Sequence, residues 1–75
     1  MSKNKFFHPV RTVGYSASHS PEWNVLKGRS KGLNYLTIGK ELEALATVNH
    51  KKNPHIASVF RKAARIAYKR HDEHE

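Results

Sequence analysis

The sequence predicts a small single domain of the α+β class, in which a short N-terminal β-hairpin or extended arm precedes an antiparallel pair of helices. Three observations support this prediction. The first half of the chain is rich in β-forming and turn-forming residues, the second half carries two amphipathic helical patterns, and 75 residues suffice for one thin core. A mostly helical fold with a flexible N-terminal arm is the alternative.

The N-terminal third contains candidate strands. Residues 1–5 are polar, and we expect them to be disordered. Residues 6–15 read FFHPVRTVGY, which favours β-structure, although Pro9 restricts the segment to an edge strand. Residues 16–21 have the composition of a loop. Trp23, Val25 and Leu26 then predict a second short extended segment, with the single tryptophan anchoring the core.

A positively charged turn is expected next. Residues 27–32 read KGRSKG, a run with two glycines and three cations. Lys27, Arg29 and Lys31 would therefore lie at the tip of a turn.

The first helical pattern lies over about residues 38–48. Ile38, Leu42, Leu45 and Ala46 recur at i, i+4, i+7 and i+8, the spacing of one helical face. Thr37 is a suitable N-cap for this helix. Residues 49–52 form the break that follows it, and they include the cations Lys51 and Lys52.

The second helical pattern lies over about residues 54–70. Asn53 followed by Pro54 combines an N-cap residue with proline at the first helical position. The apolar residues that follow repeat with helical spacing, and they are Ile56, Val59, Phe60, Ala63, Ile66 and Ala67. The domain would then span residues 6–71. Residues 72–75 would form a solvated acidic tail that could shield the basic helix.

Charge indicates an anionic partner. The chain has 14 Lys and Arg residues against six Asp and Glu residues, a formal net charge of +8. All of the cations lie within residues 1–71, where the acids are only Glu22, Glu41 and Glu43. Such a field speeds encounter with anionic partners and favours contacts with phosphates.

The last predicted helix carries its cations as a stripe. Arg61, Arg65 and Lys69 stand at i, i+4 and i+8 with Lys62 beside them, opposite the apolar face. Solvated helix faces usually mix charge signs, yet residues 50–71 contain no acid. We therefore predict a nucleic-acid-binding face made of Arg61, Lys62, Arg65 and Lys69, which Lys51, Lys52, Lys27, Arg29 and Lys31 could extend.

Two functions fit this pattern. The first is binding of DNA or RNA, mostly through phosphates, with a regulatory role. The second, typical of small phage regulators, is binding to an acidic surface of a larger protein machine such as RNA polymerase or the ribosome. An apolar spot beside the cations would favour the second function, and Phe6, Phe7 and Trp23 are candidates for it.

Sequence-specific recognition has weaker support. The two helical patterns are spaced loosely as in a helix-turn-helix motif, but the break is long and no third helix precedes the pair. Tyr35 and Tyr68 could stack on bases if they were exposed, although both are typical packing residues.

Catalytic and metal-dependent functions are not expected. The chain has no cysteine, no phosphate-binding glycine loop and no nucleophile elbow. Glu41 and Glu43 are two apart on one helix and so point to different sides. Six histidines without thiolates are a poor zinc ligand set. We therefore expect neither a cofactor nor a small-molecule substrate.

Membrane association is not expected either. No apolar run is long enough to span a bilayer, and the N-terminus lacks the apolar region of a secretory signal. The apolar face of the last helix is rich in alanine, which is weak for insertion into a membrane surface. The expected location is the cytoplasm.

Overall fold

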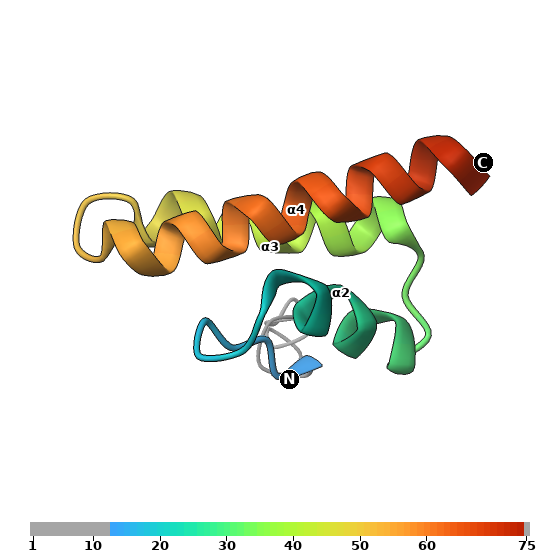
Figure 1. Ribbon diagram of the computed structural model, residues 1–75, viewed down its shortest axis with the longest axis horizontal. Coiled ribbons are helices and arrows are strands. Elements are labelled where there is room, and N and C mark those ends of the chain that lie inside the picture. The colour runs from blue at the N-terminus through green and yellow to red at the C-terminus, as the bar shows by residue number, and fades with distance from the viewer. Residues whose placement is uncertain (1–12, 75) are drawn as a thin grey trace, which may run out of the picture.

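The computed structural model describes residues 13–74, which are mostly helical (Figure 1). Helix α2 spans Pro21–Ser30, α3 spans Tyr35–Asn49 and α4 spans Pro54–His74. The two long helices α3 and α4 run antiparallel along each other, and α2 packs against both (Figure 1). No strand occurs within residues 13–74, so the predicted α+β class is wrong and the described part is an all-helical domain.

Helix α2 replaces the second extended segment that the sequence predicted. The Ser20 hydroxyl caps the helix by accepting a hydrogen bond from the Trp23 backbone N–H at 3.1 Å. Pro21 is pre-organised for the first helical position, and Glu22 lies at the positive end of the helix. These local starting signals outweigh the β-propensity of Trp23 and Val25. The loop predicted over residues 16–21 is confirmed for residues 16–20, and only Pro21 belongs to the helix.

The predicted turn over residues 27–32 is also mostly helix. Helix α2 continues to Ser30, and its last turn contains Lys27 and Arg29, where cations favour the negative end of the helix. The chain turns only afterwards, at Gly32, whose φ of 85° suits glycine.

The core lies where the three helices meet. It consists of Val25, Ile38, Leu42, Ala46, Ala57, Phe60, Ala63, Ala64 and Ala67. The prediction that Trp23 anchors the core is wrong. Its indole is only half-buried and stacks on the His19 ring with 3.8 Å between ring centroids. Most of α4's contribution is alanine, which lets the helix backbones approach closely.

Helix α3 begins three residues before the expected Ile38. Its N-cap is Asn34, whose side-chain oxygen accepts a hydrogen bond from the Thr37 backbone N–H at 2.8 Å. Thr37 therefore lies inside the first turn and is not the cap.

Helix α4 begins at Pro54 and continues to His74, four residues beyond the expected end at residue 70. The ring of His74 stacks on Tyr35 with 5.9 Å between centroids, which holds the end of α4 against the start of α3. Residues 72–74 are thus the last turn of a helix and not a separate tail.

Some expectations concern residues outside the described range. These are the disorder predicted for residues 1–5, the part of the predicted edge strand over residues 6–12 with Phe6 and Phe7, and the position of Glu75. Among the helices of residues 13–74, none is both long and apolar enough to cross a membrane.

Candidate functional site

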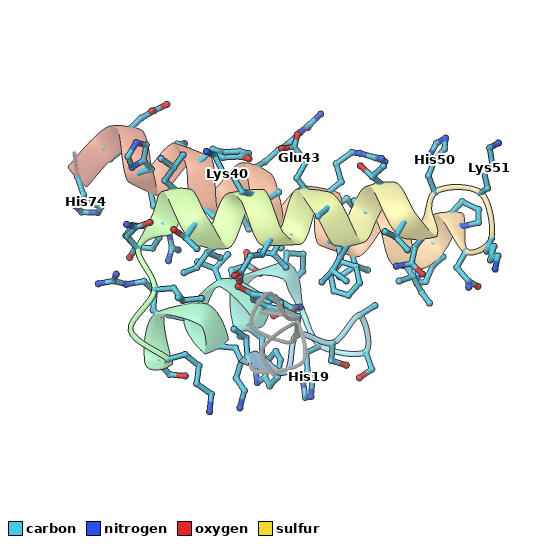
Figure 2. The ribbon with its side chains drawn as sticks, turned by 180° about the vertical axis from the view of Figure 1, so that it is seen from behind. His19, Lys40, Glu43, His50, Lys51 and His74 are labelled. Carbon is cyan, nitrogen blue, oxygen red and sulfur yellow. The ribbon has the colours of Figure 1, made fainter. Side chains whose placement is uncertain are left out.

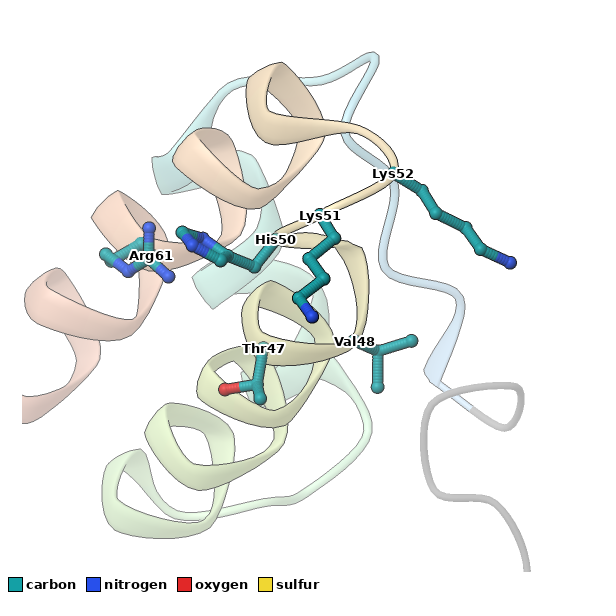
Figure 3. Close-up of a pocket in the computed structure, with 6 residues that line it drawn as sticks. All are labelled: Thr47, Val48, His50, Lys51, Lys52 and Arg61. Atoms are coloured by element: carbon teal, nitrogen blue, oxygen red, sulfur yellow. The ribbon is translucent and has the colours of Figure 1, made fainter.

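A groove runs between α3 and α4 on the side of the pair that faces away from α2. Figure 2 shows Glu43 on α3, and His50 and Lys51 just after the end of α3, projecting on that side. The groove contains two hollows. One of about 300 Å³ is lined by Glu43, Thr47, Arg61, Ala64, Arg65 and Tyr68. The other, of about 510 Å³, is lined by Thr47, Val48, His50, Lys51, Lys52 and Arg61 (Figure 3). Thr47 and Arg61 line both hollows, so we treat them as one surface, the basic groove.

Helical spacing explains why these side chains meet. Glu43 and Thr47 of α3 and His50, its C-cap, stand at i, i+4 and i+7, which places them on one face. On α4, Arg61 and Arg65 are one turn apart, and Tyr68 is one turn further on. Both hollows are lined by residues of these two faces, so each face forms one wall of the groove.

Four of the predicted cations belong to this groove. Arg61 and Arg65 line it from α4, and Lys51 and Lys52 lie at its end, in the turn between the helices. Figure 3 shows the Lys52 side chain extending away from the other labelled residues. Lys62 and Lys69 are exposed on α4 but line neither hollow.

The three predicted cations around α2 lie elsewhere. The Lys27 ammonium is 5.6 Å from the centre of the Trp23 ring. Arg29 donates a hydrogen bond to the Leu33 carbonyl at 2.9 Å, and its guanidinium lies 4.7 Å from the centre of the Tyr35 ring. Lys31 is the exposed C-cap of α2. Since α2 packs on the other side of the helix pair, these cations do not extend the basic groove (Figure 2).

The cations of the groove are not neutralised by neighbouring carboxylates. Within residues 13–74, none of Arg61, Arg65, Lys51 and Lys52 forms an ion pair. One acid, Glu43, lines the described groove, and its carboxylate accepts a hydrogen bond from the Tyr68 hydroxyl at 2.8 Å. Burial raises the pKa of Tyr68, and the hydrogen bond and negative charge of Glu43 raise it further, so the hydroxyl stays protonated and donates.

Sequence reasoning missed Glu43 and Val48 as parts of the site. Val48 is 74% exposed, although most large aliphatic side chains in a domain avoid water. One signal was visible: Val48 does not belong to the i, i+4, i+7, i+8 series that begins at Ile38. The contact of Glu43 with Tyr68 joins residues 25 positions apart and has no local signal.

Neither tyrosine offers a free platform for bases. The Tyr68 ring covers Gly39 so closely that a Cβ there would lie 2.7 Å from the ring. Tyr35 is in contact with the Arg29 guanidinium and the His74 ring. Both tyrosines are half-buried packing residues.

The arrangement of α3 and α4 also differs from a helix-turn-helix. In that motif the two helices meet at about 90–120°, whereas α3 and α4 lie antiparallel (Figure 1).

Within residues 13–74 there is no group of three or more potential metal-ligating side chains. Comparison of the chain with protein-family models, curated proteins and solved structures finds no match, so the groove is interpreted from its own geometry.

Proposed function

We propose that the protein binds nucleic acid through phosphate contacts in the basic groove. The observation that carries this proposal is the convergence of Arg61 and Arg65, both exposed and without ion pairs, with Lys51 and Lys52 along one open groove. A guanidinium presents its donors as a planar fork that matches phosphate oxygens. An open groove of cations can follow a phosphate backbone without reading its sequence.

Recognition is expected to be largely independent of sequence. No aromatic side chain in the described groove is free to stack on a base, since Tyr68 is engaged by Gly39 and Glu43. The antiparallel helices also do not present α4 as a helix-turn-helix recognition helix. The affinity should therefore come from neutralised phosphates and released counterions.

A salt titration tests this proposal. Binding to a short labelled DNA duplex and to a single-stranded RNA is measured by fluorescence anisotropy over a range of salt concentrations. Two to four phosphate contacts predict a slope of log K against log salt of about −1.8 to −3.6 for the duplex and about −1.4 to −2.8 for the single strand. Absence of binding to both ligands at low salt would contradict the proposal.

Charge reversals locate the interface. Arg61→Glu should weaken binding strongly, because Arg61 lines both hollows. Lys31→Glu is the matched control, since it makes the same change of net charge at an exposed residue next to α2. Equal losses in the two variants would show that net charge alone, and not the groove, governs binding.

Val48 supports a second candidate function, binding to an acidic protein surface. Its exposed side chain shares a hollow with Lys51, Lys52 and Arg61, so a partner that carries an apolar residue beside acidic ones would meet complementary groups there. On this alternative, an acidic peptide containing leucine should bind more tightly than poly-glutamate. Val48→Ser should remove that preference and leave binding of a DNA duplex unchanged.

A further inference from the structure

Glu43 occupies the middle of a groove that is otherwise neutral or cationic. It is exposed on α3 between Lys40 and His50, and all three project from the same edge of the helix (Figure 2). It lines the same hollow as Arg61 and Arg65 but forms an ion pair with neither. A carboxylate in this place repels a phosphate that would otherwise lie between the two arginines and the turn.

The Glu43 carboxylate is held in the groove by a rigid neighbour. Tyr68 donates its hydroxyl to Glu43 Oε1 at 2.8 Å, and its ring is packed on Gly39. Because the ring is packed on Gly39, the hydroxyl stays at the groove and offers the carboxylate a hydrogen-bond donor there. This hydrogen bond favours side-chain conformations of Glu43 that keep its negative charge in the groove.

Glu41 shows how a similar carboxylate can lie outside the groove. It accepts a hydrogen bond from the Tyr15 hydroxyl at 2.7 Å. Because it is two residues from Glu43 on the same helix, it lies on a different side of α3 and lines neither hollow. The two acids thus have the same helix and the same kind of partner, and they differ in position relative to the groove.

On the basis of the proposed function, we propose that Glu43 determines which polyanions the basic groove accepts. It disfavours a chain of directly joined phosphates, such as inorganic polyphosphate, because no neutral group of that chain can lie opposite the carboxylate. It is compatible with a nucleic-acid strand, in which sugars separate the phosphates. In RNA, the ribose 2′-hydroxyl opposite Glu43 can donate a hydrogen bond to the carboxylate.

The test compares Glu43→Gln with Glu41→Gln, each titrated with polyphosphate and with single-stranded RNA at 0.15 M salt. Glutamine removes the charge and keeps a side-chain oxygen that can accept from the tyrosine. One unit charge about 6 Å from a phosphate changes affinity about threefold in a water-like dielectric without salt, and about twofold when screening at 0.15 M salt is included. Glu43→Gln should therefore tighten polyphosphate binding about twofold or more, and RNA binding by less. Glu41→Gln should change both by clearly less than Glu43→Gln does, because Glu41 lies on another side of the helix, farther from the groove, and is screened more strongly.

Three results would overturn the role of Glu43. Equal tightening of polyphosphate binding in the two variants would show an effect of net charge alone. Unchanged polyphosphate binding in Glu43→Gln, or equal tightening for both ligands, would remove the discrimination. Wild-type protein that binds polyphosphate but not RNA or DNA would instead refute the proposed function, and that result is read from the wild-type curves alone.

Discussion

Asn24 shows how one buried side chain can fix the conformation of a loop. The loop lies before α2, and the sequence pattern does not predict its shape. The Asn24 side chain is fully buried. The side-chain oxygen accepts from the Ser16 N–H at 2.7 Å, and the amide nitrogen donates to the carbonyls of Ser16 and Ser20, each at 2.9 Å. An asparagine that satisfies both ends in this way fixes the loop before α2 onto the helix and avoids the cost of burying an unpaired amide.

Asn24→Ala should lower the free energy of unfolding by about 2–3 kcal/mol. The change removes three hydrogen bonds and leaves backbone groups of the loop with fewer partners. Urea denaturation followed by circular dichroism measures the effect. Ser18→Ala, at an exposed residue of the same loop, is the control and should change stability by less than about 0.5 kcal/mol. Equal stabilities of the two variants would contradict this role of Asn24.

At the scale of the elements, the sequence contains recognisable signals for helix starts. It does not show whether such a signal outweighs the β-forming residues beside it. The Asn53–Pro54 pair predicted a helix start at the residue where α4 begins. Ser20–Pro21–Glu22 carries a comparable signal for α2, but the β-forming residues after it favoured an extended segment. Packing of Val25 and Gly28 of α2 against the helix pair adds tertiary stability that a local propensity cannot include.

Gly39 tests the packing between α3 and α4. Alanine usually stabilises a helix relative to glycine by about 1 kcal/mol. Here the new Cβ would lie 2.7 Å from the Tyr68 ring, which the Glu43 hydrogen bond holds in place. Gly39→Ala should therefore lower the free energy of unfolding by about 1–3 kcal/mol, against the helix propensity. An increase in melting temperature would show that the ring moves aside freely.

At the scale of the whole molecule, the length of α4 places its acidic end away from the basic groove. A rise of 1.5 Å per residue puts Asp72 about 16 Å along the helix from Arg61 and about 10 Å from Arg65, the nearer of the two groove arginines. Both separations exceed the Debye length of about 8 Å at physiological salt. The sequence suggested that the acidic tail could shield the basic helix. Asp72 and Glu73 do not fit this expectation, because a helical segment that continues α4 cannot fold back over the groove.

The double variant Asp72→Asn, Glu73→Gln should change the affinity for a DNA duplex by less than twofold at 0.15 M salt. At 0.01 M salt the Debye length is about 30 Å, and the same variant should then bind more tightly than wild type. Anisotropy titrations at both salt concentrations measure this difference. A large gain at 0.15 M salt would indicate that these acids do contact the groove.

The sequence alone determined the net charge of +8, the two amphipathic patterns of the C-terminal half and the solvent-facing stripe that contains Arg61 and Arg65. Periodicity can do this because it relates each side chain to the axis of its own helix. Only the tertiary structure decided which cations share a surface. Helix α2 covers one side of the α3–α4 pair, so the groove is left on the other side, and Lys27, Arg29 and Lys31 are separated from it (Figure 2). The meeting of Glu43 with Tyr68 likewise depends on the register between two helices, which is set by long-range packing that no local pattern encodes.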